Sequence, residues 1–442
     1  MAAQGTKSDS FFRTLGSGNK TSHQRWVICT LLFFATVIAY VDRGVLAYLE
    51  KFLQSIIPGL NSVKYGYILS GFTVAYAIGM VVAGGLTDKL GTRKAFAIAI
   101  GLWSIAAMLP GAAFSVITLG IAMFLLGIGE AANFPACIKT VAEWFPKRER
   151  ALATGIFNSG ANIGNIVVPL IVPTLVALVT WRGAFVVTGG LGIVWLSIWL
   201  IYYRRPEHHR SVSQAELQLI LSDPVEKLEK VPWKRVLPCK ETWAFSIGKF
   251  LTDPIWWFYL FWLPRYLQTT FGLSLSSNRL PLVIVYSISI VGSVGGGWIS
   301  SLLLNSGRSL NVSRKTAMLI CALCVVPVFA APFIHNLWAV VALIGLATAA
   351  HQGWSANLFT LPSDVFPKSA VGSVIGIGGM SGAIGGALFQ LATGYIVYFT
   401  HSYIPLFGIA CAAYVLALLI IHSMTPKLAP AQLNLNEGRT TA

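Results

Sequence analysis

Charged residues are scarce in this chain. Lys, Arg, Asp and Glu make up 11% of its 442 residues and hydrophobic residues make up 55%, whereas a soluble domain carries about 25% charged residues. The mean hydropathy is +0.69. A surface with so few charges cannot face water over most of its area, which excludes a soluble globular protein. We therefore predict an all-α polytopic membrane protein.

The chain also lacks the motifs of ATP-driven pumps and of common enzymes. It has no G-x-x-x-x-G-K-S/T loop, and no predicted strand precedes its glycine-rich run at Gly376–Gly386, so close helix packing explains these glycines better. No nucleophile–base constellation stands out. The six cysteines are scattered, and the C-x-x-C at Cys321 and Cys324 lies in an apolar span without further ligands nearby. We expect no enzymatic activity, no cofactor, no metal and no bound nucleotide.

Long apolar runs occupy most of the chain instead. The run from Trp26 to Leu46 is long enough to cross a hydrocarbon core of about 30 Å. It is also too long and continuous for a cleaved signal peptide. The sequence predicts twelve such spans, at 26–46, 65–86, 95–113, 117–138, 151–178, 183–203, 243–267, 280–304, 316–334, 337–360, 371–398 and 403–424.

The formal net charge of +16 does not indicate a nucleic-acid partner, because its distribution follows the predicted spans. Most Lys and Arg residues fall in the amino terminus, the even-numbered connections and the carboxyl terminus. Five fall in the other loops or at the end of a span beside them: Lys51, Lys64, Arg182, Arg265 and Arg279. This asymmetry is the positive-inside rule. It predicts that both termini are cytoplasmic and that the protein resides in the lipid bilayer of a bacterial inner membrane.

The only long connection divides the spans six and six. The predicted organisation is a disordered tail at 1–25, a six-helix bundle at 26–203, a cytoplasmic linker at 204–242, a second bundle at 243–424 and a tail at 425–442. Within the linker, Ser213-Gln-Ala-Glu216 is typical of a capping box that opens a short amphipathic helix.

The two halves repeat one another. An offset of 221 positions carries Arg93-Lys94 onto Arg314-Lys315 and Phe145-Pro146-Lys147 onto Phe366-Pro367-Lys368. The same offset relates further residue pairs: Glu143 and Asp364, Gly155 and Gly376, and Gly164 and Gly385. A duplicated six-helix unit is typical of secondary transporters, whose substrate site lies near the midplane between the halves.

The segment Gly84–Lys94, GGLTDKLGTRK, resembles the G-x-x-x-D-R/K-x-G-x-R/K-R/K motif of the major facilitator superfamily. The resemblance implies twelve helices in two pseudo-symmetric bundles and a charge latch on the cytoplasmic side. The residues of this gating motif are Gly84, Asp88, Lys89, Gly91, Arg93 and Lys94. The second half keeps a degraded copy, Gly296-Gly297 followed by Arg314-Lys315.

Few ionisable residues lie at membrane depth, where each costs about 2.5–3.5 kcal/mol. They are Asp42, Arg43, Glu130, Lys249, Asp253 and His351. Adjacent helical residues point about 100° apart, so Arg43 is free to meet a partner that Asp42 does not face. That partner is either Glu130, as a helix-holding ion pair, or a substrate carboxylate, which a guanidinium binds with two parallel hydrogen bonds.

Lys249, Asp253 and His351 each have a purely structural alternative to a role in transport. Lys249 either contacts substrate or pairs with Asp253, one helical turn away. Asp253 precedes Pro254 and can instead satisfy backbone groups freed there. His351 either relays a proton or is held by hydrogen bonds.

Polar and aromatic side chains supply the rest of a candidate sugar site. They are Tyr76, Asn158, Asn162, Trp256, Trp257, Gln352 and Asn357. Amides and hydroxyls match sugar hydroxyl groups, while aromatic faces pack on the C–H surface of a sugar ring. Each residue also suits a role in helix packing or in the aromatic belt.

Five segments resemble the anion:cation symporter branch of that superfamily, and most closely its hexuronate transporters. They are Tyr40–Arg43 (Y-x-D-R), Gly127–Pro135 (GxGEAxxFP), Glu143–Arg150 (EWFPxxER), Lys249–Leu267 and His351–Pro367. The resemblance runs from about residue 25 to residue 425. It implies import of galacturonate or glucuronate with protons, and we expect a monomer.

Carried onto matching positions, the resemblance implies that Asp42 and Glu130 couple protons and that Arg43 and Tyr76 bind substrate. Lys249 occupies the basic position of the seventh span. One departure is Met123, which stands where relatives usually carry an Arg seven residues before the Glu, so the proton stoichiometry is left open. The glycine-proline signature of drug antiporters is missing from 155–169.

Two other functions stay open. One is symport of another organic anion, such as an aldonate, an aldarate or a sugar phosphate, although a dianion favours more cations than this chain provides. The other is a membrane sensor that binds a sugar acid and signals. The connection from Tyr203 to Trp243 is small for the partner-binding domain that a sensor needs.

Overall fold

The computed structural model describes residues 22–222, 233–431 and 433, apart from a few side chains inside helices, and every regular element within these ranges is a helix. The first half contains α2 (Gln24–Ile56), α3 (Ser62–Leu90), α4 (Thr92–Met108), η1 (Leu109–Ala112), α5 (Val116–Glu130), α6 (Asn133–Trp144) and α7 (Lys147–Tyr202). The connection contains η2 (Pro206–His208), α8 (Gln214–Ile220) and α9 (Trp233–Val236). The second half contains α10 (Lys240–Phe261), α11 (Leu263–Thr270), α12 (Arg279–Asn305), α13 (Leu310–Val325), η3 (Val326–Phe333), α14 (Leu337–Leu358), α15 (Leu361–Val365), α16 (Lys368–Thr400) and α17 (Ile404–Met424).

The helices account for the twelve predicted spans. Among the described residues, nine helical stretches are long and apolar enough to cross a membrane. One of them contains α7, whose backbone leaves the helical region at Val179 and Thr180, so α7 supplies two crossings. α3 and α10 have 29 and 22 residues and supply the other two. α10 is less apolar because it carries Lys249 and Asp253.

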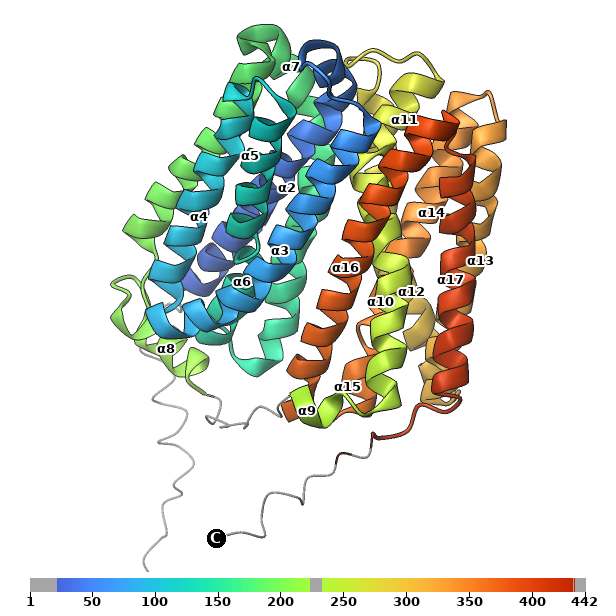
Figure 1. The fold of residues 1–442 in the computed structure, drawn as a ribbon. Coiled ribbons are helices and arrows are strands. Elements are labelled where there is room, and N and C mark those ends of the chain that lie inside the picture. The colour runs from blue at the N-terminus through green and yellow to red at the C-terminus, as the bar shows by residue number, and fades with distance from the viewer. Residues whose placement is uncertain (1–21, 223–232, 432, 434–442) are drawn as a thin grey trace, which may run out of the picture.

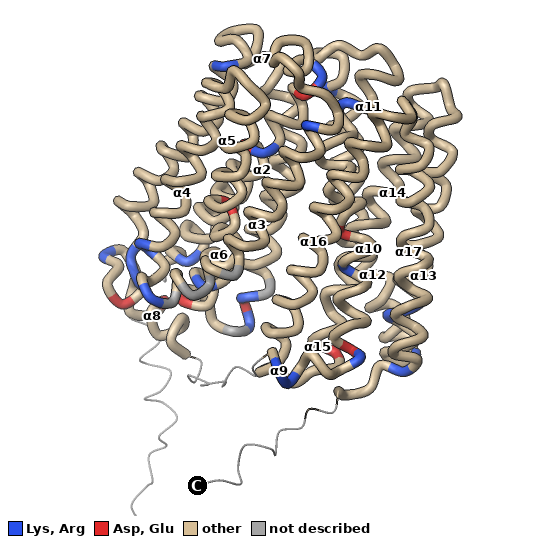
Figure 2. Tube along the Cα trace, in the orientation of Figure 1, with Lys and Arg blue, Asp and Glu red and all other residues tan. Residues whose placement is uncertain are grey.

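The helices form two bundles that lie side by side (Figure 1). The first bundle contains α2–α7 and the second contains α10–α17, and they meet where α3 contacts α16 and where α7 contacts α12. We call the end that carries α8 and α9 the linker end, and the opposite end the far end. Figure 2 shows charged residues gathered mainly towards these two ends. Residue 203 as the end of the first bundle and residue 243 as the start of the second stay a prediction.

Polar contacts join the bundles at the far end. Arg265 of α11 forms a 2.5 Å ion pair with Glu50 of α2, whose side chain is fully buried. Lys51 donates to the Gln268 carbonyl at 2.8 Å, and Tyr65 donates to the Phe261 carbonyl at 3.1 Å. The first predicted span ended at residue 46, but α2 continues to Ile56, so Glu50 lies inside a helix at the bundle interface.

Away from the far end, the Gln352 amide donates to Asn162 across the bundle interface at 3.4 Å. Most polar contacts between the bundles that join described residues lie at the far end.

Within the first bundle, the linker helix α8 caps the start of α2. Ser213 accepts a hydrogen bond from the Glu216 amide at 3.2 Å, as the predicted capping box requires. The Glu216 carboxylate does not accept the reciprocal hydrogen bond from the Ser213 amide, which donates to the Ser22 hydroxyl instead. It accepts hydrogen bonds from the Gln24 and Arg25 amides at 3.1 Å and forms a 3.0 Å ion pair with Arg25, because the first amides of α2 have no partners within that helix.

These contacts control the titration of Glu216. Burial alone raises the pKa of its carboxyl, but hydrogen bonds from Ser22 and from the amides and side chain at the start of α2 outweigh burial and lower the pKa below its usual value of 4.5. A carboxyl with a lowered folded-state pKa stabilises the fold above its unfolded pKa, and this contribution is lost as pH falls through the folded value.

We predict that Glu216→Gln lowers the free energy of unfolding by roughly 1–3 kcal/mol at pH 7. The difference from the unmodified protein should shrink below about pH 4.5, where the carboxylate itself takes up a proton. Thermal unfolding in detergent as a function of pH measures this. Glu207→Gln, at an exposed acid on η2, is the matched control and should change little. A pH-independent difference contradicts this explanation.

Candidate functional site

Arg43 lies near the middle of α2 and forms a 2.5 Å ion pair with Glu130 at the end of α5. Their side chains are 3% and 0% exposed. The pair therefore points into the protein and away from lipid. The sequence left two partners open for Arg43, and Glu130 is its partner in this structure.

Aromatic rings enclose the Arg43 guanidinium. Its central carbon lies 4.4 Å from the centre of the Tyr40 ring, 5.4 Å from Tyr76 and 5.9 Å from Trp257. These rings come from α2, α3 and α10, so both bundles contribute to the surroundings of one cation. Such contacts stabilise a desolvated cation by roughly 2 kcal/mol or more in total.

Asp42 is also buried, at 2% exposed, but neither oxygen of its carboxyl has a hydrogen-bond partner among the described residues. It follows Val41 and precedes Arg43, so it faces a different side of α2. A buried carboxylate without a partner is costly, whereas a protonated carboxyl is neutral. The predicted role of Asp42 in proton coupling stays a prediction.

Lys249 and Asp253 form a 2.7 Å ion pair along α10. The Lys249 ammonium also lies 4.1 Å from the centre of the Phe359 ring. Of the two roles that the sequence left open for Lys249, the structure contains the pairing with Asp253. Contact with a substrate stays a prediction.

His351 on α14 is buried between two aromatic residues. Its Nδ1 lies 2.7 Å from the Tyr414 hydroxyl on α17, and its ring stacks on Trp256 with centres 5.2 Å apart. The predicted sugar-stacking residue Trp256 therefore covers His351, whereas its neighbour Trp257 lies beside Arg43 and Tyr76.

The candidate amides divide into three kinds of position. The Gln352 amide donates to Asn162 across the bundle interface at 3.4 Å. Asn357 donates to the Gly296 and Gly353 carbonyls at 2.9 Å and so ties α12 to α14. Asn158 is exposed on α7. Only the first pair links the bundles, whereas Asn357 has the packing role that the sequence also allowed.

The gating motif spans the turn between α3 and α4. Gly91 adopts φ 75°, which a residue with a side chain rarely adopts, and this turn starts α4. Arg93 donates to the Leu200 carbonyl, Lys94 and Lys89 are exposed, and Gly84 belongs to α3. The side chain of Asp88 lies outside the described residues, so the charge latch stays a prediction.

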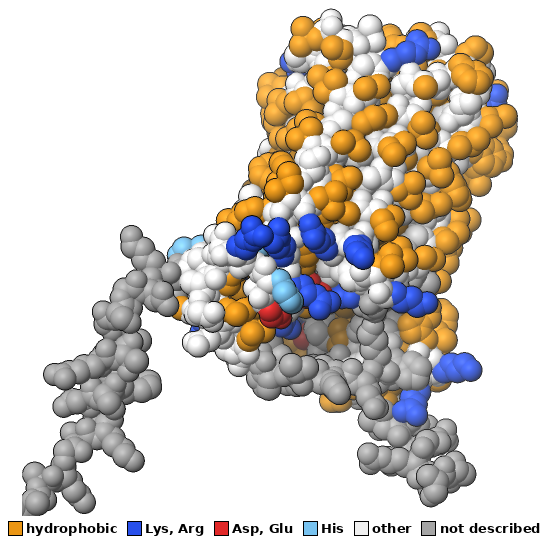
Figure 3. Space-filling view, turned by 90° about the vertical axis from the view of Figure 1, so that its left-hand side faces the viewer, with side chains coloured by type: hydrophobic (Ala, Val, Ile, Leu, Met, Phe, Trp, Pro, Cys, Tyr) orange, Lys and Arg blue, Asp and Glu red, His pale blue; other side chains and the backbone are white. Residues whose placement is uncertain are grey.

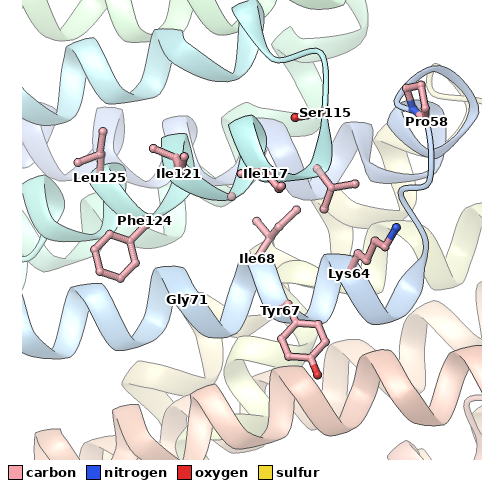
Figure 4. Close-up of a pocket in the computed structure, with 12 residues that line it drawn as sticks. Pro58, Lys64, Tyr67, Ile68, Gly71, Ser115, Ile117, Ile121, Phe124 and Leu125 are labelled. Atoms are coloured by element: carbon pink, nitrogen blue, oxygen red, sulfur yellow. The ribbon is translucent and has the colours of Figure 1, made fainter.

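A cavity of about 850 Å³ lies elsewhere, between α3 and α5 (Figure 4). Ile68, Ile121 and Phe124 line it, and Lys64 lies near one end. Its walls are largely apolar, and several of its residues are exposed on the outside of the first bundle. It does not suit a polar sugar acid. Among the described residues, no cluster of three or more His, Cys, Asp or Glu side chains suits a metal ion.

Two bundles of spanning helices, with buried ion pairs close to their interface, define a polytopic membrane transporter. The sequence pattern of the Major Facilitator Superfamily matches residues 32–390. The chain belongs to this superfamily, and it is an integral membrane protein and not an enzyme.

The chain is similar along most of its length to three bacterial proteins. It is 28% identical to the hexuronate transporter of Escherichia coli K12, over 90% of this chain and 93% of that one. It is 30% identical to the D-galactonate transporter of E. coli O6:H1, over 85% and 90%. It is 32% identical to the probable galactarate/D-glucarate transporter of Bacillus subtilis 168, over 88% of each chain. These three relatives are transporters of sugar acids.

Solved structures confirm the fold. The bacterial homologue of the human lysosomal transporter Spinster, in an inward-facing and unoccupied conformation, aligns with a TM-score of 0.71 at 18% identity, over 91% of this chain and 94% of that one. A D-xylose–proton symporter aligns with a TM-score of 0.69 at 16% identity, over 91% and 98%. The predicted arrangement of twelve helices in two bundles is confirmed.

We predict that Arg43→Gln lowers the free energy of unfolding by about 3–5 kcal/mol, because it leaves Glu130 buried without a partner. The double variant Arg43→Gln, Glu130→Gln should recover most of that stability, since no charge is left unpaired. Thermal unfolding of the purified variants measures both. Arg308→Gln, at an exposed site, is the control. Additive losses from the two single variants contradict direct coupling.

Proposed function

We propose that the protein imports a sugar acid with protons by alternating access, and that a hexuronate such as galacturonate or glucuronate is its substrate. The observation that carries this proposal is the buried Arg43–Glu130 pair beside the unpartnered carboxyl of Asp42. The similarity to hexuronate, galactonate and galactarate/glucarate transporters supports a substrate of this class. The linker end then faces the cytoplasm of a bacterial inner membrane, in accord with the positive-inside rule.

The substrate carboxylate replaces Glu130 on Arg43. A guanidinium donates two parallel hydrogen bonds to one carboxylate, so an internal and an external carboxylate compete for the same fork. When the substrate binds, Glu130 loses its partner in a buried place and takes up a proton. Binding of the anion and binding of the proton therefore favour one another.

Asp42 carries the second proton in this mechanism. It has no partner to lose, so its protonation depends on access to water. An imported monoanion opposes an inside-negative potential by about 2.3 kcal/mol per 100 mV. One proton cancels this cost, and a second makes the potential drive uptake.

The remaining groups bind the sugar ring. Tyr76 and Trp257 lie beside Arg43 and offer a hydroxyl and an aromatic face. Gln352 and Asn162 meet between the bundles, where their amides can exchange their mutual contact for sugar hydroxyl groups. Lys249 becomes available for a second contact when Asp253 is neutralised.

The conformation described here suits the inward-facing stage of the cycle. Ion pairs and hydrogen bonds close the far end, including Glu50 with Arg265. Opening towards the periplasm requires these contacts to break while new ones form at the linker end, as in the rocking of one bundle against the other.

We predict that Asp42→Asn with Glu130→Gln abolishes accumulation driven by an imposed pH gradient but leaves counterflow measurable. Counterflow exchanges labelled for unlabelled substrate and needs no net proton movement, whereas accumulation needs a carboxyl that releases its proton inside. Uptake into proteoliposomes measures both. Glu207→Gln is the control. Proton-driven accumulation that persists in the double variant disproves the assigned coupling residues.

We predict that galacturonate and glucuronate compete best for uptake of labelled galacturonate under an imposed pH gradient, ahead of galactonate, galactarate and a hexose phosphate. The dianions should compete least, because the site offers only Arg43 and Lys249 as cations. Stronger competition by an aldonate or aldarate assigns the protein to that substrate instead. Binding without accumulation in sealed vesicles identifies a sensor.

A further inference from the structure

A strongly basic cavity lies at the linker end, on the outer side of the first bundle. It has a volume of about 400 Å³ and lies between the start of α4 and the end of α7 with η2. Its charged and titratable lining residues are Arg93, Lys94, Glu143, Arg204, Arg205 and His208. Figure 3 shows basic side chains gathered on this face, below a broad apolar surface.

The one acid of the cavity is already engaged. Glu143 accepts hydrogen bonds from the Thr92 hydroxyl at 2.7 Å and from the Tyr203 hydroxyl at 2.6 Å. Arg93 donates to the Leu200 carbonyl. Among the described residues, Lys94, Arg204 and Arg205 have no carboxylate partner. Four Lys and Arg side chains and one carboxylate of the described residues line the cavity, which therefore carries a net positive charge.

The second half of the repeat provides an internal comparison. There Arg314 occupies the place of Arg93 and pairs with Asp364 at 2.9 Å, and it also donates to Ser300 at 3.0 Å. Lys315 occupies the place of Lys94 and donates to the Thr425 carbonyl at 2.5 Å and to the Pro426 carbonyl at 2.9 Å. The second half satisfies its basic pair within the protein. In the first half Arg93 donates to a carbonyl, but neither Arg93 nor Lys94 pairs with a carboxylate among the described residues, and both line an open cavity.

The surroundings of the cavity indicate where its ligand comes from. Ile201, one turn or less from Arg204 and Arg205, is 77% exposed, and Ile98, one turn beyond Lys94, is 55% exposed. Side chains of this kind face hydrocarbon in a membrane protein. The basic groups thus lie at the border between the apolar belt and water, which is the depth of lipid headgroups.

We propose that this cavity binds the phosphate headgroup of an anionic phospholipid, with the acyl chains running over the exposed apolar side chains of α4 and α7. Arg204 and Arg205 contact the phosphate from the segment between α7 and η2, and Arg93 and Lys94 contact it from the start of α4. The phosphate monoester of a soluble metabolite carries about 1.5 to 2 negative charges at pH 7 but cannot use the apolar surface beside the cavity. This site is independent of the cargo proposed above.

Native mass spectrometry of the full-length protein in detergent tests the proposal, with phosphatidylglycerol as the probe and phosphatidylethanolamine as the neutral comparison. Arg204→Gln with Arg205→Gln should weaken binding of phosphatidylglycerol by about fivefold for each charge removed. Lys234→Gln with Arg235→Gln removes the same charge from exposed positions on α9 and is the matched control, with binding expected to stay unchanged.

Two further measurements complete the test. Arg204→Lys with Arg205→Lys keeps the charge and should retain most of the binding, and each single Gln variant should lose about fivefold if the double variant does not fold. Glycerol 3-phosphate, which carries the phosphate without acyl chains, should not displace the lipid. Equal losses from the two double Gln variants overturn the proposal, as does displacement by glycerol 3-phosphate, which assigns the cavity to a soluble phosphate.

Discussion

One buried ion pair constrains the rest of the proposed mechanism. Arg43 and Glu130 are enclosed by aromatic rings and helices, so neither charge can be left alone there without a cost of several kcal/mol. Glu130 is stable as an anion against Arg43 or as a neutral acid, and Arg43 is stable against Glu130 or against another carboxylate. In the proposed mechanism, a site limited to these states couples the binding of an anionic substrate to the binding of a proton without a conformational change of its own. The resemblance to the anion:cation symporters leads us to expect an Arg where this chain has Met123, and among the described residues Arg43 is the only cation within ion-pair distance of Glu130.

A further buried ion pair, Glu50 with Arg265, joins the two bundles and does not belong to the proposed substrate site. Arg43 and Glu130 belong to one bundle, Lys249 and Asp253 belong to one helix, and Arg314 and Asp364 belong to the other bundle. These pairs survive a rigid rotation of one bundle against the other. Glu50 and Arg265 join the two bundles, and separation of the far end must break their contact. In the proposed cycle, water reaches both charges when the far end opens, and their hydration offsets the loss of the ion pair. The open and closed states can then be similar in free energy, as alternating access requires.

The sequence supports the fold more fully than it supports the site. Hydropathy and charge asymmetry located the spans, and the break in α7 at Val179 and Thr180 falls between two predicted spans. Spacing along one helix also suggested the Lys249–Asp253 pair, since residues four apart lie on one face. Contacts between different helices leave no regular spacing in the sequence, so the sequence does not predict them. The bond from His351 to Tyr414, and the place of Trp257 rather than Trp256 beside Arg43, depend on how helices are rotated against one another. Glu50 was missed because hydropathy falls before α2 ends.

The charged side chains near the bundle interface indicate how many negative charges a substrate can carry. Two cations, Arg43 and Lys249, face three acids, Asp42, Glu130 and Asp253. With every group ionised the set carries one negative charge, which repels an anion. Protons on Asp42 and Glu130 make the set positive by one, and a monoanion then brings it to neutrality. A dianion leaves an unbalanced negative charge in a place of low dielectric unless Asp253 is protonated as well. The same two protons exceed the charge of a monoanion by one, so the cycle that suits this site best is also one that an inside-negative potential drives.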